Sequence, residues 1–206
     1  MLESWRGSAT AYPRDASIQQ LFEAQVDAAP EAVALSFDGG ELSYRELDER
    51  ANRLAHLLAR RGGGPEVPIG LYLRRSPEMV IALLAILKVG GAYVPLDPEY
   101  PRDRLSFMIE DCRVPLLLTE TRLVERLPVH RAALLCLDAL TAELDASPTG
   151  PIDRATLSPA HLAYVIYTSG STGLPKGAMN TQGALRNRLL SMQEAYPLDA
   201  TDRVLH

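Results

Sequence analysis

Short apolar runs alternate with longer amphipathic stretches along almost the whole of this 206-residue chain. The runs have the length and composition of buried strands, and the stretches between them repeat apolar residues at helical spacing. Such alternation predicts an α/β protein with a mostly parallel sheet flanked by helices, because parallel strands need crossover connections. Strands are expected at residues 32–37, 67–73, 92–95, 114–118, 133–136, 163–167 and 176–180, and helices at 18–26, 43–60, 76–89, 105–109 and 181–195.

Several helix ends are marked by capping residues. Ser43 and Glu46 have the spacing of a capping box, in which each side chain bonds the backbone N–H of the other residue. Ser76 before Pro77 indicates another helix start, and Gly90 is expected to end that helix. These signals predict where two of the longest helices begin and where one of them ends.

Two further expectations concern the helix at residues 181–195 and the connection at residues 138–159. In helix 181–195, Leu185, Leu189 and Met192 share one face and are expected to point inward. Residues 138–159 are more polar and contain three prolines, so they predict a long connection within the domain.

The stretch 163–177 joins an apolar strand to a loop of small polar residues that closes on Pro175, Lys176 and Gly177. Glycines let a backbone bend round an anion and present its N–H groups, while hydroxyls add short neutral donors. A lysine adds a mobile point charge suited to phosphate. We therefore predict a nucleotide phosphate cradle, with candidate residues Thr168, Ser169, Gly170, Ser171, Thr172, Gly173, Lys176 and Gly177.

Other interpretations of this stretch fit less well than the cradle. The Walker pattern requires Ser or Thr after its lysine, whereas Gly177 follows Lys176 here, and the GxSxG elbow of hydrolases does not match. Composition alone also allows a flexible surface linker. The strong strand before the loop and the Pro-Lys pair favour the cradle, since a linker needs neither.

Composition excludes several functions. The formal net charge of −5 and the pI near 5.4 argue against nucleic acid as a partner. Cys112 and Cys136 lie far apart without a CxxC motif, which predicts a reduced, cytosolic chain with buried thiols. The four histidines lack metal-ligand spacing, so no metal site is expected. The longest apolar run, residues 79–87, is too short to span a bilayer, so no membrane partner is expected either.

Three segments together resemble one family. Residues 42–58 are similar to the first core motif of adenylation domains in non-ribosomal peptide synthetases, and residues 87–101 are similar to the second. Residues 168–177 match the phosphate-binding signature Thr-Ser-Gly-Ser-Thr-Gly-x-Pro-Lys-Gly of acyl- and aminoacyl-adenylating enzymes. The resemblance covers essentially the whole chain, and both the order and the spacing of the motifs agree.

This resemblance implies a domain organisation. Residues 1–16 look like a lead-in linker from an upstream domain. Residues 17–206 would form a partial adenylation (AMP-binding) domain, truncated at its C-terminus, that is the first part of the large N-terminal subdomain of an adenylate-forming enzyme. The resemblance places the amino-acid pocket, a ligand for the metal and a mobile C-terminal subdomain beyond the chain, so the isolated chain is expected to be inactive.

The resemblance also implies a reaction. An amino-acid carboxylate attacks the α-phosphorus of ATP to give aminoacyl-AMP and pyrophosphate, and the acyl group then passes to a phosphopantetheine thiol. The implied cofactors are ATP, Mg²⁺ and the phosphopantetheine of a partner carrier domain. The implied partners are the amino acid and the peptidyl carrier and condensation domains of the same synthetase. The cradle would hold the β and γ phosphates, and Lys176 is the catalytic candidate because negative charge grows on the leaving pyrophosphate.

Two alternatives stay open at this point. An acyl- or aryl-CoA ligase shares the phosphate signature, although the Gly90–Asp97 form of the second motif favours a peptide synthetase. An inert, truncated folding unit is the non-enzyme alternative. One departure from the family is Gln182, which stands where family members usually carry histidine. Which amino acid is activated does not follow from this sequence.

Overall fold

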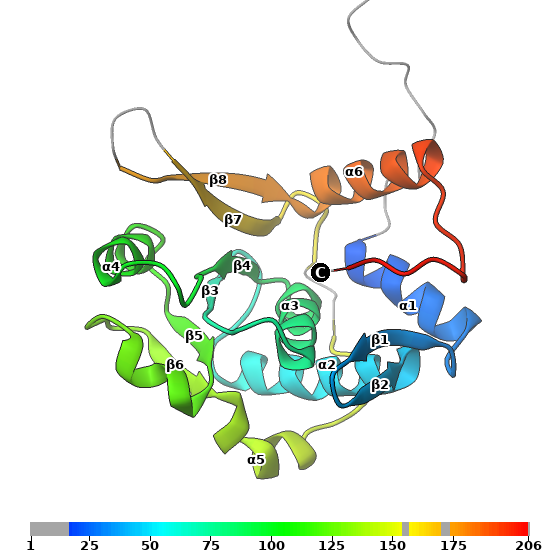
Figure 1. Ribbon diagram of the computed structural model, residues 1–206, viewed down its shortest axis with the longest axis horizontal. Helices are drawn as coiled ribbons and strands as arrows, with labels where there is room; N and C mark the ends of the chain where they lie inside the picture. Colours follow the sequence, from blue (N-terminus) through cyan, green and yellow to red (C-terminus); the bar gives the residue numbers. More distant parts are fainter. Residues whose placement is uncertain (1–16, 154–156, 170–173, 206) are drawn as a thin grey trace, which may run out of the picture.

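A six-stranded sheet forms the centre of the computed structural model, which describes residues 17–153, 157–169 and 174–205 (Figure 1). Its strand order is β6-β5-β3-β4-β7-β8; the first five strands run parallel, and β8 is antiparallel to β7. The strands are β3 (Pro68–Leu71), β4 (Ala92–Pro95), β5 (Leu116–Thr119), β6 (Ala133–Cys136), β7 (Leu162–Thr168) and β8 (Lys176–Thr181). The expected α/β fold with a mostly parallel sheet is confirmed.

Helices cover both faces of the sheet, and a hairpin of two short strands packs beside them. The helices are α1 (Ile18–Ala28), α2 (Tyr44–Arg60), α3 (Pro77–Val89), α4 (Arg102–Asp111), α5 (Thr141–Asp145) and α6 (Gln182–Ala195), with 3-10 turns η2 (Thr121–Arg126) and η3 (Leu137–Ala139). The hairpin consists of β1 (Val33–Phe37) and β2 (Gly40–Ser43). No helix in these described ranges is long and apolar enough to cross a membrane.

Side chains alternate across the sheet, so the core has a layer on each face. On β5, Leu116 and Leu118 pack in the cluster formed with α2 and α3, whereas Leu117 packs in the cluster formed with α4. All three leucines are buried, as expected for a parallel strand covered on both faces. This two-sided burial accounts for the continuous apolar runs in the sequence.

The predicted capping residues make the expected contacts. Ser43 N–H donates to Glu46 Oε2 at 2.8 Å and Glu46 N–H donates to Ser43 Oγ at 3.2 Å, which completes the capping box of α2. Met79 N–H donates to Ser76 Oγ at the start of α3. Gly90 ends α3 with φ of 85°, a left-handed conformation that glycine adopts without steric cost.

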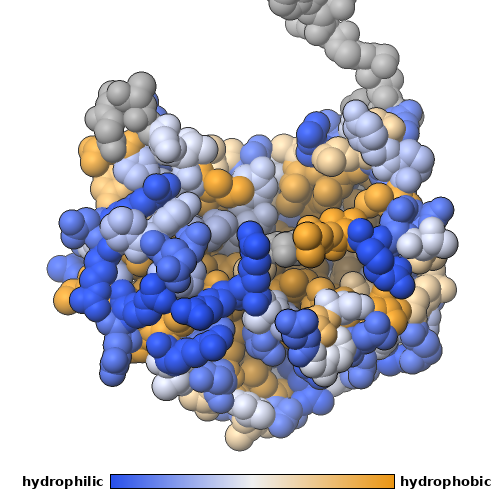
Figure 2. Space-filling view, viewed as in Figure 1, coloured by the Kyte–Doolittle hydropathy of each residue, from blue (hydrophilic) through white to orange (hydrophobic). Residues whose placement is uncertain are grey.

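The prediction for helix α6 was wrong in part. Leu185 packs against the small cluster of Ile18, Leu87 and Ala163, but Leu189 is 45% exposed and Met192 is 43% exposed. The buried residues of α6, Gln182 and Arg186, lie in its first two turns, whereas residues 191–195 are all exposed. Figure 2 shows hydrophobic side chains gathered where α6 and the segment after it run, and hydrophilic side chains over α4 and the region of β6.

The connection 138–159 is more ordered than its composition indicated. It contains part of η3 and all of α5, and its residues 145–150 are bonded to helix α2. Arg53 donates to the Asp145 carboxylate at 3.1 Å, Arg60 donates to Ser147 Oγ at 2.8 Å, and His56 Nε2 lies 3.0 Å from the carbonyl oxygen of Gly150. The polar residues of both segments therefore bond to each other rather than to solvent alone.

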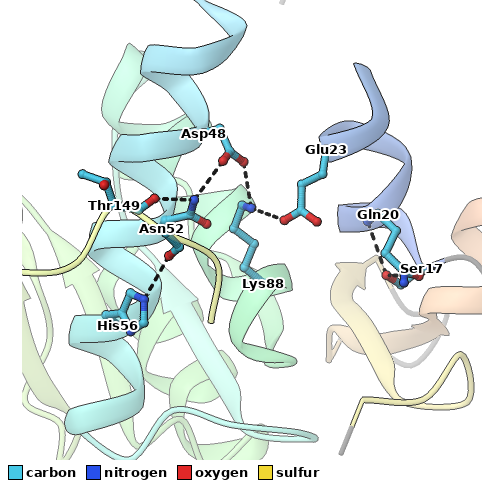
Figure 3. Close-up of polar contacts among 9 residues, drawn as sticks. Ser17, Gln20, Glu23, Asp48, Asn52, His56, Lys88 and Thr149 are labelled. Carbon is cyan, nitrogen blue, oxygen red and sulfur yellow. Dashed lines mark hydrogen bonds and ion pairs between the residues drawn. The ribbon is translucent and has the colours of Figure 1, made fainter. Parts of the chain in front are cut away.

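A buried lysine joins three helices (Figure 3). Lys88 of α3 is fully buried and forms ion pairs with Glu23 of α1 and with Asp48 of α2, the latter at 2.8 Å. Asn52 donates to the second oxygen of Asp48 and to the carbonyl of Thr149, both at 2.8 Å. This Lys88 network links α1, α2, α3 and the connection through one desolvated charge.

Candidate nucleotide-binding site

The predicted cradle lies on the β7–β8 hairpin at one edge of the sheet. Strand β7 alternates buried Ala163, Val165 and Tyr167 with more exposed residues, as a strand with one face on the core does. Strand β8 runs antiparallel to β7 and back toward α6. The end of the hairpin where β7 finishes and β8 begins projects from the rest of the molecule (Figure 1). The described residues at this end of the hairpin, Thr168, Ser169 and Lys176, are exposed.

The structure brings the two ends of the predicted cradle together. Thr168 is the register partner of Lys176, and its hydroxyl donates to the Lys176 carbonyl at 3.5 Å. Thr168, Ser169, Lys176 and Gly177 are all exposed. The predicted residues Gly170, Ser171, Thr172 and Gly173 lie outside the described residues.

Lys176 carries an exposed ammonium group at the start of β8. Within the described ranges its side chain forms no ion pair, in contrast to Lys88, and the chain contains no other lysines. An exposed lysine is a mobile point charge that can reach an incoming phosphate. The arrangement suits binding of an anionic ligand beside Thr168 and Ser169.

Gly177 has a packing reason for being glycine. It is the register partner of Tyr167, and a Cβ atom at Gly177 would lie 3.0 Å from Val165 Cγ1 and 3.3 Å from Tyr167 Cζ. Both neighbouring side chains are buried and have little freedom to move away. The structure thus gives Gly177 a role in strand packing, and its role in ligand binding stays a prediction.

Tyr167, the last buried residue before the cradle, is bonded to helix α4. Its hydroxyl donates to Asp111 Oδ2 at 2.6 Å and lies 3.2 Å from Cys112 Sγ, and its ring meets Phe107 edge-on at 6.3 Å. Burial, reinforced by the bond to Asp111, raises the pKa of the Tyr167 phenol far above its usual value. The hydroxyl therefore stays protonated, and remains a donor, at every pH where the protein works.

Sequence reasoning missed this contact. The only available signal was a tyrosine on the inward face of a strand, since a buried phenol needs a partner for its hydroxyl. The partner, Asp111, lies 56 residues away at the end of α4. Cys112 and Cys136 are both free, as expected of a reduced chain, but they are half-buried and not buried as expected.

A second tyrosine anchors the opposite end of the hairpin. Asn180 Nδ2 donates to the Tyr164 hydroxyl at 2.7 Å, and the Tyr164 ring lies 5.5 Å from that of Tyr93 on β4. Burial raises the pKa of Tyr93 to about 12. Gln182, the departure from the family pattern, is buried at the start of α6, where its N–H donates to the carbonyl of His161.

A sizeable cavity lies elsewhere among the described residues. It has a volume of about 670 Å³ and is lined by parts of α2, α3 and α5, with Leu54, Ile81 and Leu137 among its apolar residues and Arg50 and Asp138 among its charged ones. None of the described cradle residues, Thr168, Ser169, Lys176 and Gly177, lines it. We therefore place the candidate site at the exposed hairpin and not in this cavity.

Comparisons with known proteins agree on one family. The family model described as AMP-binding enzyme matches residues 22–206. The chain is 47% identical over 191 residues to a dimodular nonribosomal peptide synthase of Bacillus subtilis, and 45% identical over 189 residues to zwittermicin A synthase ZmaJ of Bacillus cereus. These matches cover 92% and 91% of this chain, but only 8% and 35% of the two relatives.

Solved structures show the same arrangement. The chain resembles the nonribosomal peptide synthetase FmoA3 in its α-methyl-L-serine-AMP bound form with a TM-score of 0.84 and 30% identity. That match covers 95% of this chain and 21% of FmoA3. The N-terminal subdomain of Klebsiella oxytoca NpsA is also similar, with a TM-score of 0.72 and 25% identity over 82% of this chain and 43% of that subdomain.

Proposed function

Starting from the fact that this chain belongs to the AMP-binding enzyme family, we propose that it forms the nucleotide-phosphate-binding part of an amino-acid adenylation domain in non-ribosomal peptide biosynthesis. The observation that carries this proposal is the 47% identity to a nonribosomal peptide synthase over 92% of the chain, supported by the exposed pair Thr168 and Lys176 on the β7–β8 hairpin. The complete domain would join an amino acid to AMP and release pyrophosphate. It would then load a phosphopantetheine thiol.

The chemistry assigns separate tasks to the described residues. The amino-acid carboxylate forms a bond to the α-phosphorus while the bond between that phosphorus and the bridging oxygen breaks, so the electron pair leaves with pyrophosphate. Charge grows on the leaving group, where a cation and hydroxyl donors stabilise the transition state more than the bound ATP. We assign Lys176 to the cation, and Thr168 and Ser169 to the donors. A substrate carboxylate is already ionised at neutral pH, so the reaction needs no general base.

The proposal includes ATP, Mg²⁺ and a carrier domain, but it assigns no residue of this chain to the metal or to the carrier. Adenylate-forming chemistry uses ATP, and FmoA3 has been solved in an AMPPNP-bound form. No group of three or more His, Cys, Asp or Glu side chains in the described ranges is placed to hold a metal ion. We therefore assign no Mg²⁺ ligand to this chain and route no step through the metal. Peptidyl carrier and condensation domains of the same synthetase, in the cytoplasm, are the proposed partners.

Lysine labelling tests the phosphate role on the 206-residue chain itself. Because Lys88 is fully buried and Lys176 is exposed, an amine-reactive reagent should modify Lys176 and leave Lys88 as an internal control. Millimolar ATP should slow labelling of Lys176, while adenosine should not. Equal labelling of Lys176 with and without ATP, in this chain and in a complete adenylation domain carrying it, would contradict the proposed binding role.

Amino-acid-dependent exchange of pyrophosphate into ATP tests the reaction. We expect exchange from the complete domain that carries this sequence and none from the 206-residue chain alone, given the small share of the relatives that it spans. Exchange that depends on a fatty or aryl acid instead would assign the domain to the CoA ligases. A complete domain that is inactive with every acid would overturn the enzymatic proposal.

A further inference from the structure

The exposed cradle residues stand on strands whose placement is set by one buried tyrosine. Tyr167 precedes Thr168 directly and is the register partner of Gly177, the residue after Lys176. Its ring is the surface against which Gly177 packs, since a Cβ atom there would lie 3.3 Å from Tyr167 Cζ. Any movement of Tyr167 therefore moves both strands of the hairpin where Thr168 and Lys176 stand.

Helix α4 holds this tyrosine from outside the hairpin. The hydroxyl donates to the Asp111 carboxylate at 2.6 Å, a short contact typical of a charge-assisted hydrogen bond. Phe107, one turn earlier on α4, meets the same ring edge-on. The backbone pairing between β7 and β4 is limited to Tyr93 and Tyr164, at the far end of β7. The cradle end of β7 is therefore held by its pairing with β8, by the core cluster that it shares with β4 and α4, and by the bond from the Tyr167 hydroxyl to α4.

We propose that Tyr167 and Asp111 form a positioning pair that sets the place of Thr168 and Lys176 relative to the phosphates. This inference rests on the proposed function, because it assigns to the pair a task in the same reaction. Tyr167 is a positioning residue and does not touch the substrate. Displacing catalytic groups by about 1 Å can cost about 10²-fold in rate, so a hydrogen bond at the base of the hairpin can act on the reaction without contacting ATP.

A matched pair of variants separates positioning from folding. Tyr167→Phe removes the hydroxyl at the cradle end, and Tyr164→Phe removes a bonded hydroxyl on the same strand at the far end. In the complete domain we expect Tyr167→Phe to lower kcat for pyrophosphate exchange about 10-fold and to raise KM for ATP and pyrophosphate. KM for the amino acid should be unchanged. Tyr164→Phe should leave all these constants near wild type at a similar melting temperature.

Changes at Asp111 provide a rescue test. Asp111 is exposed and its partner, the Tyr167 hydroxyl, is neutral, so replacing Asp111 does not leave an unpaired charge in the core. Asp111→Ala removes the carboxylate acceptor, leaves only the weak acceptor Cys112 Sγ, and should reproduce most of the Tyr167→Phe defect, whereas Asp111→Asn retains a carbonyl oxygen that accepts the hydrogen bond and should keep most of the activity. The double variant with Tyr167→Phe and Asp111→Ala should be no slower than either single variant, because both remove the same bond.

The outcomes distinguish this inference from the function on which it rests. If Lys176→Ala slows exchange but Tyr167→Phe behaves like Tyr164→Phe, the positioning role alone is overturned. The positioning role is also overturned if Tyr167→Phe changes the KM of ATP and of the amino acid equally while lowering the melting temperature, since that is a general loss of structure. If the wild-type domain shows neither exchange nor ATP protection of Lys176, the proposed function and the positioning role both fall.

Discussion

The two lysines of this chain occupy opposite physical environments. Lys88 lies between three helices, has no exposed surface, and is neutralised by Glu23 and Asp48. Lys176 stands at the start of the edge strand β8, is exposed, and forms no ion pair in the described part of the chain. One residue type therefore serves structure in one region and is available for chemistry in the other.

Desolvation explains the difference. A charge taken out of water costs several kcal/mol and is tolerated only with partners close by, which Lys88 has on two sides. A group that is already paired and enclosed cannot exchange its partners for a phosphate. An exposed lysine on a hairpin keeps its charge available, at the cost of contributing little to stability. Burial and partners, rather than residue type, indicate which of the two is the candidate for catalysis.

The largest expected effect is the loss of Lys88. Lys88→Met should lower the free energy of unfolding by about 3 kcal/mol, because it takes the positive charge away from two carboxylates, Glu23 and Asp48, that have only 22% and 17% of their side chains exposed. Lys176→Met is the control and should leave it within about 0.5 kcal/mol of wild type. Urea unfolding of the full chain measures both. Equal losses from the two variants would remove the distinction between the two lysines.

Loss of Lys176 should affect the reaction rate and not the stability. In a complete adenylation domain, Lys176→Ala should lower kcat about 10²–10³-fold, as typical for removal of one group that stabilises developing charge. Ser169→Ala should cost less, because neighbouring hydroxyls and N–H groups can replace it. Steady-state exchange kinetics with a matched thermal melt tests this. A Lys176→Ala variant with wild-type kcat and ATP KM would show that the hairpin merely turns the chain.

Gly177 tests whether the hairpin that carries the exposed Lys176 also contains a position that matters for stability. Gly177→Ala should destabilise the protein by about 1–2 kcal/mol, because the added methyl group meets Val165 and Tyr167 at 3.0–3.3 Å. Gly150→Ala is the control, since a Cβ atom there meets nothing within 4 Å. Chemical unfolding of the two variants gives the difference. Equal stability would mean that Val165 and Tyr167 can move aside.

The smallest expected effect concerns Glu46, an exposed carboxylate in the first turn of α2, the helix that also carries Asp48. Hydrogen bonds from the Ser43 N–H and hydroxyl lower the pKa of Glu46 below its usual value. A lowered pKa in the folded state stabilises the protein above the unfolded pKa, and this contribution is lost as the pH falls through the folded pKa. Glu46→Gln keeps a capping-box residue that does not titrate. Between pH 6 and pH 3.5, the melting temperature of wild type should therefore fall slightly more than that of Glu46→Gln. A larger fall in melting temperature for Glu46→Gln than for wild type would contradict this prediction.

Local signals predicted much of the fold. The capping box of Ser43 and Glu46, the glycine turn after α3 and the apolar alternation of β7 each depend on residues a few positions apart. Such contacts are encoded by spacing, so helix starts and the succession of strands and helices along the chain followed from the sequence. A second strand returning from the loop was also expected at residues 176–180, and the structure adds that Thr168 is the register partner of Lys176.

Contacts between distant residues could not be predicted in this way. Tyr167 and Asp111 lie 56 positions apart, and Asn52 and Thr149 lie 97 positions apart. Their pairing depends on how helices pack on the sheet, which periodicity does not encode. The inward assignment of Leu189 and Met192 failed for the same reason, since a shared helix face does not tell how far along the helix the packing extends.

The Lys88 network sets where this chain can be joined to another in engineered hybrids. Glu23 lies 65 positions before Lys88, so a junction between α1 and α2 takes one of the two carboxylates from a different parent. The hybrid then buries a lysine with half of its counter-charge unless that parent supplies an acidic residue at the position of Glu23. A junction before Ser17 keeps the lysine, both carboxylates and the cap of α1 in a single parent. Exchange of this unit between proteins therefore has its natural boundary upstream of Ser17.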